Sequence, residues 1–301
     1  MAIARITHRW FGHFLIDRVE PGSALWYFRR DPLAIASLTI IGLLIFAAIF
    51  APWVAPYPHE GQGDPNIVNK FLPPSASHLL GTDSLGRDLL SRIIFGSRTS
   101  LAIALLIVSS SALVGTLLGA VAGYVGGWMD NLIMRVTDMF LAFPPLLLAI
   151  AIAAALGPSF MNTIIAISLT WWPWYTRIVR GQSISLRERH FVKAAQSMGV
   201  KNPIIVRRHI LPNVMTPVLV QATADLGAAI LTAASLSFIG LGPQPPIADW
   251  GMMISEGRLY VLSGRWWIAT FSGLAIFLTV LSFNLLGDSV REVADPKLRH
   301  G

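Results

Sequence analysis

Long runs without a charged side chain constrain this sequence more than any other feature. Residues 33–54, 101–125 and 266–286 contain no Asp, Glu, Lys or Arg. A helix of about 20 apolar residues crosses the ~30 Å hydrocarbon core of a bilayer, so each run is long enough to span a membrane. Over all 301 residues, 54% are hydrophobic and 13% are charged. A water-soluble protein could not bury so much apolar surface, which excludes a soluble enzyme, a nucleic-acid-binding domain and a disordered chain.

Three further apolar runs contain a few charged residues: 132–156, 162–179 and 214–239. Pro173 interrupts the second of these runs, and the third carries one acid, Asp225. We therefore predict an all-α, polytopic protein with six transmembrane helices in a lipid bilayer. The first run is too long for the core of a cleavable signal peptide, so it is expected to remain as an uncleaved anchor.

Lys and Arg residues are divided unequally between the two sides of these six spans. Seventeen lie in the N-terminal tail, in 177–208, in the C-terminal tail or at Arg135, whereas six lie in 55–98 and 240–265. Because cytoplasmic loops carry the excess of positive charge, both termini and the loop 181–213 are predicted to be cytoplasmic. The same rule accounts for the net charge of +7 without a nucleic-acid partner.

The predicted topology divides the chain into four parts. They are a basic cytoplasmic tail (1–32), the first span with its outer loop (33–98), a core domain that contains the loop 181–213 (99–290) and a cytoplasmic C-terminal tail (291–301).

The outer loop changes character along its length. Its first half is rich in proline and is expected to be irregular. From Leu85 to Ile94, apolar residues recur at helical spacing, and Asp83 and Arg87 form an i,i+4 pair. This pattern predicts an amphipathic helix at the outer membrane surface, capped by Thr82 or Asp83. The alternative is a solvated turn before the second span.

Four glycines spaced by four residues form a stripe on the second span: Gly115, Gly119, Gly123 and Gly127. Small residues let membrane helices approach closely, so the stripe predicts a packing seam, either within the chain or with another subunit. Pro144–Pro145 and Pro173 are expected to kink the third and fourth spans.

Two kinds of residue within the spans suggest separate roles. A charge at the middle of a span is costly, so Asp225 is predicted either to line a translocation path or to pair with a polar neighbour. Aromatic residues gather near the ends of two spans and are expected to lie in the membrane interface: Trp171, Trp172, Trp174, Tyr175, Trp266 and Trp267.

The loop 181–213 has the pattern of two short helices. The first is predicted from Leu186 to Met198, with Gly199 as its left-handed stop. The second is expected to begin with Asn202 as its N-cap and to end at Pro212. With Ala194 and Ala195 also near the corner, the pair forms a knob suited to docking in a partner's groove. The alternative is a basic loop that only sets topology.

The same loop carries a motif of a known family: Lys193, Ala194, Ala195, Gly199, Ile210, Leu211 and Pro212. This pattern resembles the EAA motif of ABC importer permeases, although Lys193 stands where the motif's name has Glu. The resemblance implies the type I ABC importer permease fold. It also implies that these seven residues couple this chain to an ATPase subunit.

Further motifs follow in the order found in the C-type dipeptide/oligopeptide (and nickel) branch of that family. They are 81–88, 134–138, 236–242 and 284–288. The resemblance implies a bacterial plasma-membrane permease that forms half of a pathway for di- or oligopeptides. Its implied partners are a paralogous B-type permease, two ATPase subunits and an extracytoplasmic substrate-binding protein. The outer segments are expected to receive that binding protein, with Asp83, Arg87 and Asp88 as candidate contacts.

The chain lacks the residues that would make it an enzyme. No Gly-Lys dipeptide is present, so it has no Walker A loop, and ATP with Mg is expected on the partner subunits alone. No catalytic cluster, cofactor motif or metal-ligand spacing stands out. The alternatives are the same importer class acting on nickel complexes, glutathione, opines or oligosaccharides, and an ion-coupled secondary transporter, for which Asp225 is the one candidate ion site.

Overall fold

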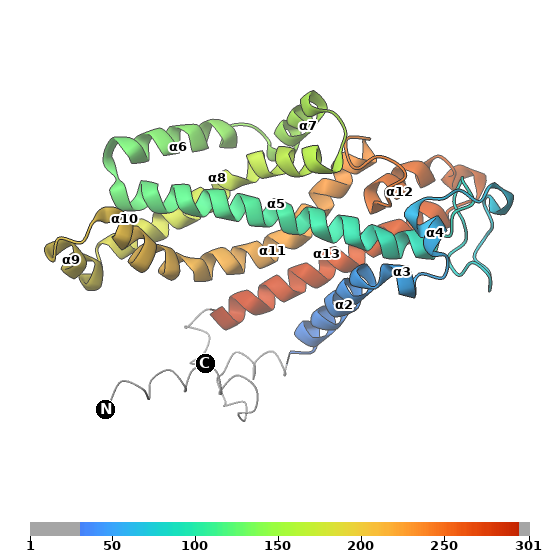
Figure 1. The fold of residues 1–301 in the computed structure, drawn as a ribbon, viewed down its shortest axis with the longest axis horizontal. Helices are drawn as coiled ribbons and strands as arrows, with labels where there is room; N and C mark the ends of the chain where they lie inside the picture. Colours follow the sequence, from blue (N-terminus) through green and yellow to red (C-terminus); the bar gives the residue numbers. More distant parts are fainter. Residues whose placement is uncertain (1–30, 295–301) are drawn as a thin grey trace.

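The computed structural model describes residues 31–294, and this part of the chain is built from helices (Figure 1). Residues 1–30 and 295–301, which make up most of the two predicted tails, lie outside the described residues. The elements in chain order are α2 (Pro32–Ile49), α3 (Ala51–Val54), α4 (Pro58–Gln62), η1 (Ile67–Asn69), α5 (Leu89–Val125), α6 (Gly127–Leu141), α7 (Pro145–Leu156), α8 (Phe160–Arg187), α9 (His190–Ser197), α10 (Asn202–Ile205), η2 (Val206–Ile210), α11 (Leu211–Phe238), α12 (Trp250–Arg258), η3 (Val261–Ser263) and α13 (Trp267–Ala294).

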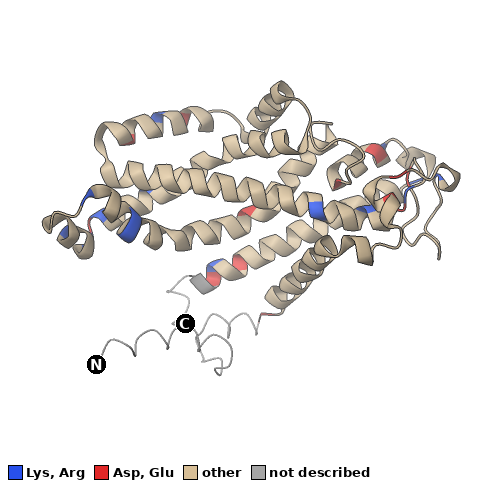
Figure 2. Cartoon of the chain, viewed as in Figure 1, with Lys and Arg blue, Asp and Glu red and all other residues tan. Residues whose placement is uncertain are grey.

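The long helices form an elongated bundle with a different set of short elements at each end. Helices α5, α8, α11 and α13 make up its length, with α9 and α10 at one end and α4 and α12 at the other (Figure 1). Charged residues are sparse along the middle of α5 and α13 and more frequent toward the bundle ends (Figure 2). This distribution is the one expected of a multi-pass membrane protein.

The number of apolar helices differs from the predicted six. Within the described residues, four helical segments are long and apolar enough to cross a membrane: Pro32–Ile49, Leu89–Val125, Asn202–Phe238 and Trp267–Glu292. The pair α6–α7 qualifies only jointly and is bent by 88°, which brings the count to at most five. Helix α8 has 28 residues but is less apolar, since it contains Pro173, several Trp residues and three Arg residues.

The predicted third span is two helices with a sharp break between them. Helix α6 ends at Leu141, and α7 begins at Pro145. Pro144 is extended, with φ −57° and ψ 123°, because the residue before a proline avoids the helical region. The predicted kink at Pro144–Pro145 is therefore confirmed and is large enough to separate the span into two helices.

Three of the four striped glycines form a seam inside the chain, between α5 and α8. A Cβ added at Gly115 would lie 2.5 Å from the carbonyl oxygen of Trp172, and one added at Gly123 would lie 2.5 Å from that of Arg180. From Gly115 to Gly123 on α5, the contacted residue on α8 moves from Trp172 to Arg180. The residue numbers increase together, so α5 and α8 run in the same direction. Gly127 has no neighbour within 4 Å of a built Cβ and is the first residue of α6.

Substituting Gly119 is expected to open this seam. A Cβ there would lie 2.6 Å from the carbonyl oxygen of Thr176, so Gly119→Val must push α5 and α8 apart. Such overpacking costs about 1–3 kcal/mol. The thermal unfolding midpoint of the purified protein in detergent should fall. The control Gly42→Ala, where nothing lies within 4 Å of the added Cβ, should leave that midpoint unchanged. An unchanged midpoint in Gly119→Val would contradict the close approach.

The predicted amphipathic helix in the outer loop is wrong. Residues 82–88 form a loop, and α5 begins at Leu89 as one continuous helix with the second span. Asp88, rather than Thr82 or Asp83, is the N-cap, because its Oδ2 accepts from the backbone N–H of Ser91 at 2.8 Å. The apolar spacing from Leu89 onward marked the first turns of this long helix rather than a separate element.

Three of the six aromatic residues that were predicted to lie in the membrane interface, Trp172, Tyr175 and Trp267, are buried within the protein. Trp172 and Tyr175 are buried in the bundle, and the Trp267 indole N–H donates to the carbonyl oxygen of Thr82 at 3.1 Å. Trp174 and Trp266 are about half exposed. Whether a ring faces the interior depends on the side of the helix on which its residue lies, not on how close the residue is to the helix end.

Candidate functional site

Helices α9 and α10 form a knob at one end of the bundle, which we define as residues 190–212. Gly199 ends α9 in the left-handed conformation, with φ +73°, as predicted. Its N–H donates to the carbonyl oxygen of Gln196 at 2.9 Å, and the Val200 N–H donates to that of Ala195 at 3.1 Å. This pair of bonds is a Schellman motif, so the corner of the knob has a fixed geometry.

The boundaries of the knob differ from those predicted. Helix α8 continues to Arg187, so α9 begins at His190 rather than at Leu186. Lys201 is the N-cap of α10, and Asn202 is its first helical residue.

The second helix does not end at Pro212. It continues through a π turn, η2, into α11, and the Leu211 N–H donates to the carbonyl oxygen of Val206. Pro212 is the second residue of α11 and follows directly after the π turn. The α10 part of the knob is therefore joined to the long helix α11 by unbroken helix.

The motif residues of the knob divide into an inner and an outer set. Ala195 is 3% exposed and Ile210 is fully buried, and both pack in a cluster with Val192, Ile205 and Val214. The expectation that Ala195 faces a partner's groove is therefore corrected, because its own chain covers it. The outer set is exposed: Lys193, Ala194, Gly199 and Pro212. Leu211 is intermediate.

The outer face of α9 is apolar at helical spacing. Phe191 and Met198 are 44% and 75% exposed, and the exposed Ala194 lies between them. Lys193 and Glu188 form an exposed ion pair at 2.8 Å, and this hydrogen bond lowers the pKa of the Glu188 carboxyl group. An exposed apolar strip with a small residue at its centre is suited to packing against another protein.

A tyrosine that the sequence did not single out joins the knob to α5. The Tyr124 hydroxyl donates to the Asn202 side-chain oxygen at 3.1 Å and accepts from the Gln196 side chain at 3.2 Å. One hydroxyl thus connects the end of α5 to both sides of the Gly199 corner. Nothing in the local sequence indicated this role, because Tyr124 is 72 positions from Gln196 and 78 positions from Asn202.

Asp225 lies in α11 beside a cavity of about 720 Å³ between α7, α8 and α11. Its Oδ2 accepts from the Tyr175 hydroxyl at 2.7 Å, and its Oδ1 accepts from the Gln221 side chain at 2.8 Å. Asp225 therefore pairs with polar neighbours and also lines this cavity, while its place on a translocation path stays a prediction. Gln221, one helical turn away, was recognisable from its i,i+4 spacing, whereas Tyr175 was not.

The three candidate docking residues in the outer loop are buried rather than presented to the outside. Asp83, Arg87 and Asp88 are 2%, 1% and 1% exposed. The Arg87 Nε donates to Asp83 at 2.6 Å, and its Nη2 donates to Glu256 of α12 at 3.0 Å. Their predicted role as direct contacts for a binding protein does not fit this burial. Arg87 joins the loop to α12, whereas Asp83 and Asp88 make their contacts within the loop and the start of α5.

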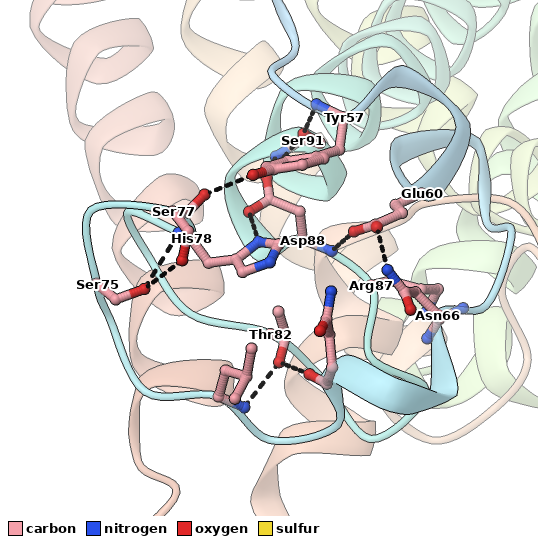
Figure 3. Close-up of polar contacts among 12 residues, drawn as sticks. Tyr57, Glu60, Asn66, Ser75, Ser77, His78, Thr82, Arg87, Asp88 and Ser91 are labelled. Atoms are coloured by element: carbon pink, nitrogen blue, oxygen red, sulfur yellow. Dashed lines mark hydrogen bonds and ion pairs between the residues drawn. The ribbon is translucent and has the colours of Figure 1, made fainter.

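Asp88 organises a second group of contacts in the same loop (Figure 3). Its Oδ1 lies 2.9 Å from the His78 ring nitrogen, and its backbone N–H donates to Glu60 at 2.7 Å. The Tyr57 ring stacks on His78 with centroids 4.7 Å apart. The predicted irregular first half of the loop is thus fixed to the start of α5.

The second outer segment packs against the first. The Trp250 indole N–H donates to the carbonyl oxygen of Ile93 at 3.0 Å, and Trp250 is fully buried. Asp249 caps α12 by accepting from the Met252 N–H at 3.0 Å, and burial raises the pKa of its carboxyl group. Residues 55–98 and 240–265 therefore form one outer unit.

No arrangement in the described part of the chain is suited to metal binding. Within residues 31–294, no three His, Cys, Asp or Glu residues are grouped so that they could hold a metal ion.

The apolar helices, the cavity beside Asp225 and the protruding knob define a multi-pass membrane protein of the transporter class. The chain belongs to the family described as binding-protein-dependent transport system inner membrane component, whose model matches residues 115–300. A second model, the N-terminal TM domain of oligopeptide transport permease C, matches residues 22–74. The resemblance inferred from the sequence motifs is therefore confirmed.

Several relatives are similar to this chain over about nine tenths of their length. The probable D,D-dipeptide transport system permease protein DdpC of Escherichia coli (strain K12) is 44% identical over 283 residues, 93% of either chain. The dipeptide transport system permease protein DppC of Alkalihalophilus pseudofirmus is 46% identical, over 90% of this chain and 88% of its own. The glutathione transport system permease protein GsiD of Escherichia coli O157:H7 is also 46% identical, over 94% and 93%.

Proposed function

We propose that this chain is the C-type permease subunit of an ATP-driven, binding-protein-dependent importer of di- or oligopeptides. The observation that carries the proposal is the unbroken helical path from the knob through η2 into α11, which bears Asp225. Motion imposed on the knob by a nucleotide-hydrolysing partner would therefore reach the cavity directly. The substrate class follows from the relatives, which are named for dipeptides, D,D-dipeptides and glutathione.

The proposed assembly contains a B-type permease, two ATPase subunits with ATP and Mg, and an extracytoplasmic binding protein. The outer face of α9, with Phe191, Ala194 and Met198, is the proposed contact with an ATPase subunit. Lys193, Gly199, Ile210, Leu211 and Pro212 set the shape and surroundings of that contact.

The outer unit is the proposed contact with the binding protein. In this proposal Asp83, Arg87 and Asp88 act indirectly, by fixing the shape of a surface on which exposed residues such as Val68 and Leu262 lie.

Six membrane crossings are proposed in the bacterial plasma membrane, with α8 as the fourth span. The glycine seam supports this proposal, because in it α8 packs along α5 and runs in the same direction. Two neighbouring helices that run in the same direction require the chain between them to return, which supports our proposal that the bent pair α6–α7 is the third crossing.

This topology predicts which positions face the cytoplasm. Single cysteines can be introduced without background because the chain has none. An impermeant thiol reagent applied to intact cells should label a cysteine at position 68 strongly and one at position 201 weakly. Opening the cells should make position 201 reactive. Strong labelling at 201 together with none at 68 in intact cells would refute the orientation.

The transport role is tested by reconstitution of the complete complex in proteoliposomes. ATP-dependent uptake of a labelled dipeptide is expected only when the ATPase subunits and the binding protein are present. Competition with unlabelled glutathione separates the two substrate types among the relatives. Uptake that persists without ATPase subunits and follows an ion gradient would refute the proposal in favour of a secondary transporter.

A further inference from the structure

The carboxylate of Asp225 retains acceptor capacity beyond the contacts it makes within the chain. Each of its oxygens accepts one hydrogen bond, from Tyr175 or from Gln221. A carboxylate offers about four lone-pair acceptor positions, so roughly half of them stay available. Asp225 is also only partly buried and lines the cavity, which leaves its free acceptor positions accessible to a ligand there.

The other residues around this cavity favour a positively charged ligand. Asp225 is the only charged side chain among the described residues that line it, and no ion pair to Asp225 occurs within residues 31–294. Trp171 and Trp174 line the same cavity. Indole faces attract cations, and a carboxylate without an ionic partner in a mostly apolar cavity adds to that attraction.

We propose that Asp225, Trp171 and Trp174 form a subsite that binds the α-ammonium group of a peptide as it crosses the membrane. This inference rests on the proposed function, which supplies a peptide as the transported molecule. The ammonium donates to the free acceptor positions of Asp225 and lies against the indole rings, while Tyr175 and Gln221 hold the carboxylate in place. The site orients the peptide with its amino end toward α11.

Ligand binding can be measured without the binding protein, which would otherwise impose its own selectivity. The permease–ATPase complex in nanodiscs is mixed with alanyl-alanine or with N-acetyl-alanyl-alanine, and saturation transfer from protein to peptide is recorded by NMR. The free-amine peptide should bind with a Kd at least about tenfold lower, determined from the dependence of the transferred signal on peptide concentration, as expected for a charge-assisted contact. Asp225→Asn should remove this difference, and Asp225→Glu should retain most of it. Equal Kd values for the two peptides in the unmodified complex, or a difference that survives in Asp225→Asn, would overturn the proposal.

Transport by the complete complex separates a ligand contact from a purely structural one. Asp225→Asn should reduce alanyl-alanine uptake at least about tenfold, whereas Tyr175→Phe, which keeps the charge, should reduce it only about two- to threefold. The matched control Thr223→Val, on the same helix with a hydroxyl bonded back to Leu219, should transport normally.

Equal losses in Tyr175→Phe and Asp225→Asn would mean that Asp225 only anchors α8 to α11, and the inference would fail while the proposed function stood. Absence of peptide uptake by the unmodified complex, with ATPase subunits bound, would instead refute the proposed function.

Discussion

Ala195→Asp is expected to abolish ATP-driven uptake and to release the ATPase subunits on co-purification. Ala195 is 3% exposed and packs against Val192, Ile205 and Ile210, so the new carboxylate would be buried without a partner. An unpaired buried charge costs about 3–5 kcal/mol, enough to unfold a knob of two short helices. Insertion of the spans should proceed normally, since the position lies outside them. Uptake into proteoliposomes and recovery of ATPase subunits with the purified permease measure the effect.

Two companion variants identify the cause of this loss. Ala194→Asp places the same group on the exposed face of α9, so it should leave the knob folded and still weaken ATPase association. Lys201→Gln, an exposed change away from that face, should retain both association and uptake. Full transport and full ATPase association in Ala195→Asp would show that the knob has no coupling role and only sets topology.

Arg87→Ala is expected to separate the two halves of the outer unit. Arg87 is 1% exposed and donates to Asp83 and Glu256, so its removal leaves two carboxylates facing each other. The Arg92 Nε lies 3.7 Å from the Asp83 Oδ2. This distance is too long for a hydrogen bond that could replace the one between Arg87 and Asp83. Breaking a buried ion pair by removing one partner costs about 3–5 kcal/mol. The unfolding midpoint in detergent should fall, and residues 55–98 should become sensitive to limited proteolysis.

The matched control for this variant is Lys70→Ala, in the same loop but exposed. It should change neither the unfolding midpoint nor the cleavage pattern. Arg87→Ala should also lose the stimulation of ATPase activity by the binding protein, because the surface it supports changes shape. An unchanged midpoint with unchanged cleavage would show that the outer unit does not depend on this ion network.

The sequence alone was sufficient to identify the membrane class, the approximate positions of the helices and the turn at Gly199. These properties depend on short stretches of chain. An apolar run of about 20 residues is favourable in a bilayer wherever it occurs, and a glycine with positive φ ends a helix through bonds to residues three to five positions away. The family motifs were also readable because their residues are close in sequence.

Only the tertiary structure decided which of these residues face inward and what they contact. Arg87 meets Glu256 across 169 positions, and Tyr175 meets Asp225 across 50. No local pattern encodes such a pairing, because it depends on which helices become neighbours and on their rotation about their axes. The same reason explains the errors at Ala195, Trp172 and Trp267, whose burial is set by a second helix or loop. Composition determined that this chain enters a membrane, whereas the packing of distant segments placed its buried charges and its cavity.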